Sequence, residues 1–266
     1  MTQHTADERY PTPPPRGWVS AVLCWVTSLL MALALYMVFF YAPTEKTMGV
    51  VQRIFYFHVS LAWIAFLAFF LVMIASIGYL VTKKTRWDVW AYASAEIGTL
   101  FCTLVLITGS LWAKPIWNTW WTWDMRLTTT LVLWLMYVGY LMLRNYTEGE
   151  RGAKYGAVFG IIAFIDVPFV YFSIRWWRTL HPAPVIAGDT DSGLESAMLT
   201  TLFVCLITFM GLFFYLLQQR VMITHMQHDM EKIRRTIAHQ PAEYGFRVEN
   251  QDFVIEEYNF DRYKKL

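Results

Sequence analysis

The sequence predicts an all-α integral membrane protein with six transmembrane helices. Of its 266 residues, 56% are hydrophobic and only 16% are charged, which is too apolar for a water-soluble domain of this length. Six apolar stretches are long enough to cross the hydrocarbon core of a bilayer, which takes roughly 20 helical residues. They cover residues 18–41, 58–81, 91–111, 127–143, 155–174 and 197–217.

The connections between these spans are short, so we expect one six-helix membrane domain over residues 1–219 and a soluble tail over 220–266. Residues 1–17 are polar, and no small-residue cleavage site follows the first apolar stretch, which favours an uncleaved first span. Apolar residues at helical spacing predict that the sixth helix continues into the tail. Beyond Pro241, mixed charge and several aromatic residues suit a small strand or a strip that docks a partner.

Two spans contain acidic residues, which are costly inside a bilayer. Glu96 lies near one end of the third span, where its carboxylate is expected to reach the lipid headgroups. Asp166 lies deeper in the fifth span and precedes Pro168 by two residues. Because proline interrupts a helix, this pair predicts a kinked fifth helix with a polar lining.

The absence of the corresponding sequence motifs excludes several kinds of chemistry. Cys24, Cys102 and Cys205 lie inside predicted spans without any Cys-x-x-Cys, so neither a thiol redox motif nor a covalent c-type haem signature is present. They are expected to be inert packing residues. The chain has no Gly-rich phosphate loop, so we expect no ATPase activity of its own and no nucleic-acid partner. If ATP is involved, another subunit binds it.

The Lys and Arg residues of the connections predict the orientation, because cytoplasmic loops carry the excess of positive charge. Twelve of these residues fall on one side of the predicted spans and six on the other, so both termini should be cytoplasmic. Three connections then share the outer face, namely residues 42–57, 112–126 and 175–193.

The middle outer connection contains a high concentration of tryptophan. Five of the thirteen Trp residues fall within the twelve residues 112–123, and Asp124 and Arg126 follow. Trp combines a large flat apolar surface with an N–H group that needs a partner, so the cluster suits a flat amphiphilic ligand. If residues 117–124 are helical, one face carries Trp117, Trp120, Trp121 and Asp124. The alternative is an aromatic belt at the membrane boundary, which would not by itself concentrate five Trp residues in one loop.

The other two outer connections each bring one histidine to the membrane boundary. His58 begins the second span and His181 lies just beyond the fifth. Neutral imidazole is a strong axial ligand for haem iron, and two such ligands can hold one haem without a covalent link. Taken singly, each histidine better fits an interfacial hydrogen-bonding residue, whereas two of them beside a Trp-rich loop favour a haem site.

Charged residues on the same face suit the two propionates of a haem, because the planar guanidinium group binds carboxylates well. Arg53 and Arg126 are the candidates that we select, although the commoner use of such residues is to anchor helix ends at the headgroups. Asp124 has three open roles: orienting a ligating histidine, pairing with Arg126, or capping the fourth span.

Three motifs carry a resemblance to a known family. They are RIFYFHV at residues 53–59, WAKPIWNTWWTWDMRLT at 112–128 and SIRWWRTLHP at 173–182. In these motifs and across all six spans, the chain resembles the C protein of the cytochrome c maturation system, a haem-handling membrane protein of the WWD family.

The resemblance implies that His58 and His181 hold haem b at the periplasmic face of a bacterial inner membrane. The WWD segment would contact the macrocycle through Trp117, Trp120, Trp121, Trp123 and Asp124. Family members present the haem to a periplasmic haem chaperone, on which it becomes covalently attached. They associate in the membrane lipid with an ATPase subunit, a second membrane subunit and a small single-span subunit.

Three other functions stay open. A membrane cytochrome would normally hold haem within the bundle, and no histidine lies in the middle of a span. A permease for haem or another solute finds its best support in Asp166 and Pro168. A scaffold for a transport complex would leave the tryptophan-rich connection unexplained. The sequence also leaves open whether this chain catalyses the attachment of haem to the chaperone.

Overall fold

The structure is a computed structural model that describes residues 18–147, 149–177, 181, 194–238, 246–249 and 252–255. By its internal contacts the chain divides into two compact units, Met1–Val221 and Met222–Leu266. The first unit contains the residues of the predicted site.

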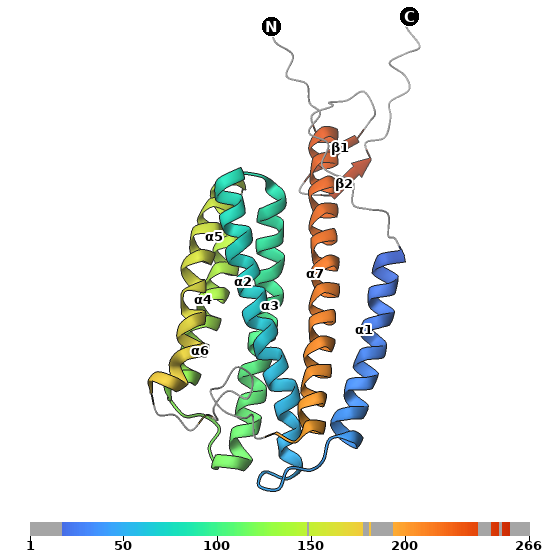
Figure 1. Cartoon of the computed structure of the whole chain (residues 1–266). Coiled ribbons are helices and arrows are strands. Elements are labelled where there is room, and N and C mark those ends of the chain that lie inside the picture. Colours follow the sequence, from blue (N-terminus) through green and yellow to red (C-terminus); the bar gives the residue numbers. More distant parts are fainter. Residues whose placement is uncertain are drawn as a thin grey trace, which may run out of the picture. The chain divides into compact units, whose positions relative to one another are not determined.

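Six spans long and apolar enough to cross a membrane are present among the described residues, which confirms the predicted number. The first consists of α1 (Trp18–Tyr36) and the π-helix η1 (Met37–Tyr41). The 3-10 helix η2 (Val50–Arg53) leads into α2 (Ile54–Thr82), and α3 (Thr85–Trp117) and α4 (Met125–Tyr146) follow (Figure 1). The fifth span combines α5 (Gly149–Phe164) with α6 (Asp166–Trp176), and α7 (Ser196–Ala238) contains the sixth.

The core of the first unit forms around α2, which packs against both α3 and α5. Phe69 of α2 stacks on Tyr137 of α4, with ring centroids 3.7 Å apart. On α5, small residues allow the close helix approach that is common in membrane bundles. At Gly160, a Cβ atom would lie only 3.0 Å from Cγ1 of Val72, so a larger residue there would push α5 away from α2.

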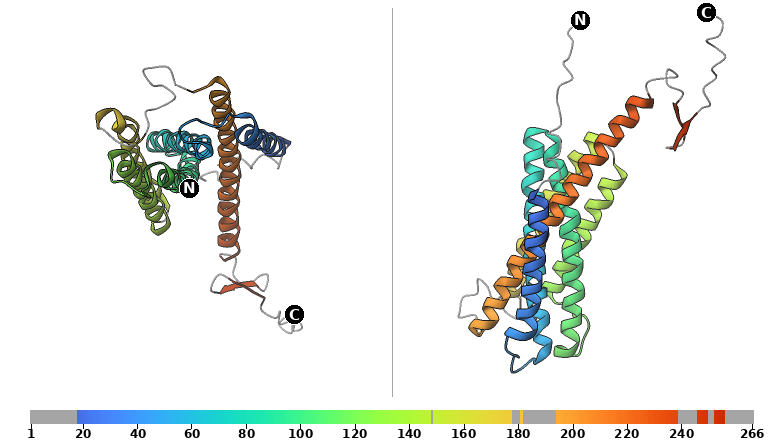
Figure 2. Two further views of the ribbon diagram at one scale, coloured as in Figure 1. Left: turned by 90° about the horizontal axis from the view of Figure 1, so that it is seen from below. Right: turned by 90° about the vertical axis from the view of Figure 1, so that its right-hand side faces the viewer.

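The helices α1 and α7 lie side by side although they come from opposite ends of the membrane domain (Figure 2). The Thr208 hydroxyl donates to the carbonyl oxygen of Leu30 over 3.2 Å, and the amide of Gln219 donates to the Ser20 hydroxyl over 2.7 Å. On its other side, α7 contacts α3 through an edge-to-face pair of Phe209 and Phe101.

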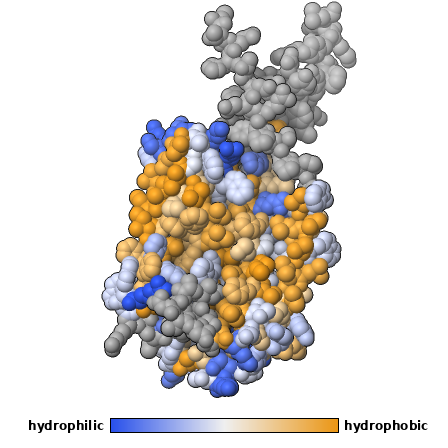
Figure 3. All heavy atoms as spheres, in the orientation of Figure 1, coloured by the Kyte–Doolittle hydropathy of each residue, from blue (hydrophilic) through white to orange (hydrophobic). Residues whose placement is uncertain are grey.

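Hydrophobic residues cover the middle of the visible face of the helices, and polar residues gather toward both ends (Figure 3). Several helices extend beyond the apolar stretches that predicted them. For example, α3 has 33 residues and reaches from Thr85 to Trp117, so its ends supply polar and aromatic side chains on both sides of an apolar middle.

The fifth span is broken at Ile165, between α5 and α6, which confirms the predicted kink. Pro168 causes the break, because it has no N–H group to donate to the carbonyl of Phe164. One carboxylate oxygen of Asp166 is buried and has no hydrogen-bond partner in the described part of the chain.

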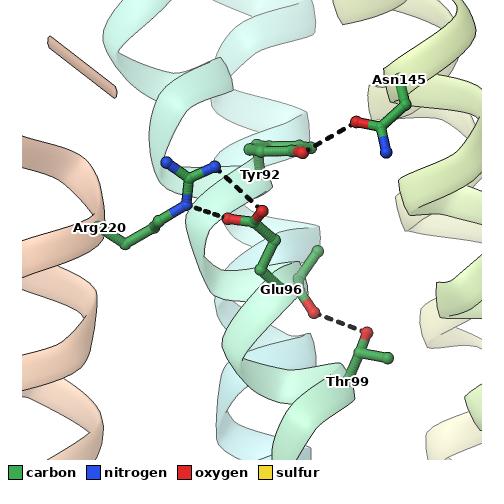
Figure 4. A network of polar contacts seen from close by, with 6 residues as sticks. Tyr92, Glu96, Thr99, Asn145 and Arg220 are labelled. Carbon is green, nitrogen blue, oxygen red and sulfur yellow. Dashed lines mark hydrogen bonds and ion pairs between the residues drawn. The ribbon is translucent and has the colours of Figure 1, made fainter. Parts of the chain in front are cut away.

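Glu96 of α3 has a partner that the sequence did not reveal. Its carboxylate accepts hydrogen bonds from Nε and Nη2 of Arg220 on α7, the second at 3.0 Å (Figure 4). Beside this ion pair, the Tyr92 hydroxyl donates to the side-chain oxygen of Asn145 over 3.2 Å. The network therefore joins α3 to α7 and to α4, and Glu96 is more than a side chain directed at the headgroups.

The second unit contains the end of α7 and a small antiparallel hairpin. Its strands are β1 (Phe246–Glu249) and β2 (Asp252–Ile255), with Phe246 opposite Ile255. The expected strand beyond Pro241 is therefore present.

Candidate functional site

A pocket lies where the start of α2, the end of α3 and the start of α4 meet. Its empty volume is about 790 Å³, including space open to the surroundings. Most of its lining is apolar. The polar and aromatic lining residues include His58, Trp112, Trp117, Trp121, Arg126 and His181. Residues more than 120 positions apart in the sequence are thus brought to one site, as the predicted topology required.

The two predicted histidines face one another closely in this pocket. Their ring centroids lie 6.4 Å apart, with 39° between the ring planes. A bond from a first-row metal ion to an imidazole nitrogen is about 2.0–2.1 Å and the ring centroid lies about 1.1 Å behind that nitrogen, so two imidazoles on opposite sides of one ion have centroids about 6.3 Å apart. The observed separation of the centroids is therefore close to that of two imidazoles bound to a single ion.

A bare metal ion would need more ligands than these two. Among the residues that the structure describes, no group of three or more His, Cys, Asp or Glu side chains is placed to hold one. The donor set therefore suits an ion whose remaining ligands belong to the bound molecule, as in a metalloporphyrin.

His58 is buried, with 8% of its surface exposed, and three residues of α3 surround its ring. Nδ1 lies 2.9 Å from the hydroxyl oxygen of Thr108. Trp112 packs edge to face against the imidazole at a centroid distance of 5.9 Å. A Cβ atom at Gly109 would lie 3.1 Å from Cε1 of His58, so the absence of a side chain there makes room for the ring.

The condition that residues 117–124 are helical is not met. α3 ends at Trp117, and Asn118 takes the left-handed conformation with φ 55°, which asparagine tolerates better than most residues. The Thr119 hydroxyl then donates to the carbonyl oxygen of Trp121 over 3.0 Å, a local bond that competes with helix formation. The segment is an irregular connection, so its tryptophans do not share a helical face.

The connection divides its tryptophans into two pairs. Trp117 and Trp121 line the pocket. Trp120 and Trp123 lie outside the lining and are 57% and 75% exposed. The ring of Trp123 nevertheless packs edge to face on Trp121, with centroids 5.7 Å apart. Contact of Trp120 and Trp123 with a ligand stays a prediction.

Asp124 caps the N-terminus of α4. One of its carboxylate oxygens accepts from the backbone N–H groups of Arg126 and Leu127 over 3.0 and 3.1 Å. The other accepts from the Thr122 hydroxyl over 2.8 Å. These bonds satisfy two N–H groups that have no partner within the helix and fix the point at which α4 begins beside the pocket. Of the three roles left open by the sequence, capping is the one with observed contacts.

Arg126 lines the pocket from the first turn of α4. Its Nη1 atom is buried and has no hydrogen-bond partner in the described part of the chain. Burying an unpaired donor is unfavourable, by about 1–3 kcal/mol. The guanidinium group is therefore placed to bind an acidic group of a ligand, which would supply the missing acceptor.

Arg53 lies outside the pocket lining, where η2 meets α2. Its Nη1 donates to the carbonyl oxygen of Val38 in η1, so it ties the end of the first span to the start of α2. In the connection between them, Glu45 accepts from the backbone N–H groups of Met48 and Thr47. These bonds hold the pKa of the Glu45 carboxyl below its ordinary value. A contact between Arg53 and a ligand stays a prediction.

Sequence reasoning did not select Thr108, Gly109 or the pocket role of Trp112. Trp112 and Thr108 are four residues apart and so lie on one face of α3, which is a readable signal. That this face meets His58 depends on how α2 packs against α3, which the sequence pattern does not determine.

Six membrane-spanning helices and a tryptophan-lined pocket that holds two facing histidines define a polytopic membrane protein with a bis-histidine site. The family model described as heme exporter protein C matches residues 14–236. The chain belongs to this family.

Curated relatives agree with this assignment. Heme exporter protein C of Bradyrhizobium diazoefficiens is 39% identical over 196 residues, covering 72% of this chain and 74% of the relative. Heme exporter protein C of Escherichia coli K12 is 32% identical over 198 residues, covering 71% and 80%. A putative cytochrome c biosynthesis ccmC-like mitochondrial protein of Marchantia polymorpha is 33% identical over 204 residues, covering 76% and 86%.

Proposed function

We propose that this protein binds haem b in the bis-histidine pocket and presents it to the periplasmic haem chaperone of cytochrome c maturation. The observation that carries the proposal is the pair of imidazole rings 6.4 Å apart in a pocket lined by tryptophan. The family assignment and the cytochrome c biosynthesis named in the Marchantia relative support the pathway.

Five pocket residues have a role in this proposal. His58 and His181 would hold the iron of a bound haem and shield it from other ligands. Trp117 and Trp121 cover the macrocycle, and Arg126 binds a propionate. The predicted contacts of Trp120 and Trp123 require their exposed rings to close on the ligand or on the acceptor.

The orientation and the partners complete the proposal. The excess of Lys and Arg on the opposite side supports an orientation with the pocket at the periplasmic face of a bacterial inner membrane and the tail in the cytoplasm. If ATP is involved, we expect an ATPase subunit to bind it, because the sequence has no Gly-rich phosphate loop. We expect that subunit to assemble with this chain, a second membrane subunit and a small single-span subunit.

The test is the absorption spectrum of the purified protein, co-expressed with its haem acceptor, beside His58→Ala and His181→Ala variants. We expect a low-spin haem spectrum that is lost or changed in both variants. Pigment that neither substitution affects would place the iron ligands elsewhere and contradict the proposal. A chain without pigment in any sample, or one that moves solute across vesicles by itself, would favour a scaffold or a permease.

A further inference from the structure

The hydrogen bond between His58 and Thr108 decides which nitrogen of the imidazole is available to a metal. Nδ1 of His58 lies 2.9 Å from the Thr108 hydroxyl oxygen, between α2 and α3. A neutral imidazole has one N–H donor and one acceptor nitrogen, so the direction of this bond fixes the tautomer. The neighbours of the hydroxyl group indicate that direction.

The proton of the Thr108 hydroxyl is engaged within α3. Its oxygen lies 2.7 Å from the carbonyl oxygen of Leu104 and 3.3 Å from that of Val105. A carbonyl can only accept, so the hydroxyl donates to the helix backbone, as threonine often does. Its oxygen is then an acceptor toward His58. This arrangement favours a proton on Nδ1.

We propose that Thr108 is a positioning residue that holds His58 in the Nδ1–H tautomer and leaves the Nε2 lone pair for the haem iron. The inference rests on the proposed haem site. Metal-binding histidines commonly donate their second ring N–H to a fixed acceptor, which orients the ring and makes the ligating nitrogen more basic.

The packing of the His58 ring against α3 supports the same role for Thr108. Gly109 leaves space beside Cε1, and Trp112 closes the ring from one edge. The bond between Nδ1 and Thr108 restricts the orientation of the ring, and His58 and His181 line the same pocket. Thr108 thus controls the orientation of the His58 ring without itself lining the pocket.

A pair of variants separates this role from ordinary packing. Thr108→Val keeps the branched shape and removes the acceptor, whereas Thr108→Ser keeps the hydroxyl. We expect Thr108→Val to reduce haem retention on the order of 10-fold. It should also raise the reduction potential of the remaining haem, because a less basic ligand stabilises ferric iron less. Thr108→Ser should restore both values. The matched control is Thr99→Val, since in the described part of the chain the Thr99 hydroxyl donates to the carbonyl oxygen of Ala95 of the same helix.

Nitrogen NMR of the haem-free wild-type protein, labelled at histidine, tests the tautomer without any substitution of Thr108. The His58 signals are assigned by their loss in His58→Ala. A protonated Nδ1 and an unprotonated Nε2 are expected, and the reverse would overturn the inference even if haem binds. A Thr108→Val protein with wild-type potential and retention would also overturn it. If His58→Ala leaves the haem spectrum unchanged, the proposed function fails, and the inference fails with it.

Discussion

The two ends of α3 differ in how their arginines are paired. Near Glu96, two arginines form ion pairs: Arg220 with Glu96 itself (Figure 4), and Arg144 with Asp88 over 2.8 Å. Arg144 keeps one buried nitrogen, Nε, without a hydrogen-bond partner among the described residues. At the other end, Arg126 has a buried nitrogen without a hydrogen-bond partner in the described part of the chain. Both ends border the same helix core.

This difference separates charged residues that stabilise the fold from charged residues that can bind a ligand. A charge satisfied within the chain contributes to holding helices together, whereas one left unsatisfied in a pocket keeps its interaction free for a ligand. Unpaired indole nitrogens do not distinguish the two ends, because Nε1 is buried without a partner among the described residues in Trp87 near the paired end as well as in Trp112 and Trp121. We therefore expect the unpaired Arg126 at the pocket end to lower the stability of the haem-free protein and to contribute to ligand binding. The ion pairs at the other end should stabilise the fold without contributing to binding.

Breaking the Glu96 pair should have the largest effect. Loss of one partner of a buried pair costs roughly 3–5 kcal/mol. Because the Arg220 and Glu96 side chains are 25% and 28% exposed, we expect Glu96→Ala to lower the free energy of unfolding by about 2 kcal/mol. Unfolding in detergent measures it, and Glu96→Ala with Arg220→Ala should recover part of the loss. Haem retention by the folded fraction should not change; if it falls with stability, the two ends are not independent.

Arg126 should respond in the opposite direction. Replacing it by methionine removes a buried unpaired donor, so the haem-free protein should become more stable by about 1–2 kcal/mol. Haem retention should fall on the order of 10-fold, because an ionic hydrogen bond to a propionate is lost. Unfolding of the haem-free protein and haem release are measured in parallel. A haem-free variant less stable than wild type would show that Arg126 is structural.

Substitutions of Asp124 test whether one residue can both stabilise the fold and bind the ligand. Asp124→Ala should lower stability by about 1 kcal/mol through loss of the cap on α4, as measured by unfolding of the haem-free protein. Asp124→Ser keeps a capping oxygen and should be close to wild type. If Asp124→Ser is stable but loses haem, the carboxylate has a ligand role in addition to the cap.

The fold and the composition of the site were predictable to different extents. Apolar stretches near the length of a membrane span located the six spans, and the alternation of these spans brought His58 and His181 to one end, where their ring centroids lie 6.4 Å apart. The orientation from charge counting stays a prediction. The shape of the tryptophan connection was not predictable from periodicity, because a left-handed Asn118 and the Asp124 cap override it. The partner of Glu96 was hidden too, since Arg220 comes from 124 positions away.

We expect the smallest effect from single substitutions of the tryptophans in the connection between α3 and α4. Trp121 lines the pocket and Trp123 is 75% exposed, so the same substitution at each gives a matched comparison. Trp121→Phe should weaken haem retention about threefold, or about 0.6 kcal/mol, because part of the aromatic cover is removed. Trp123→Phe should leave retention unchanged, and neither should lower the stability of the haem-free protein. An equal loss in both variants would mean that the connection closes over the ligand, so that exposure in the haem-free chain does not identify the contacting ring.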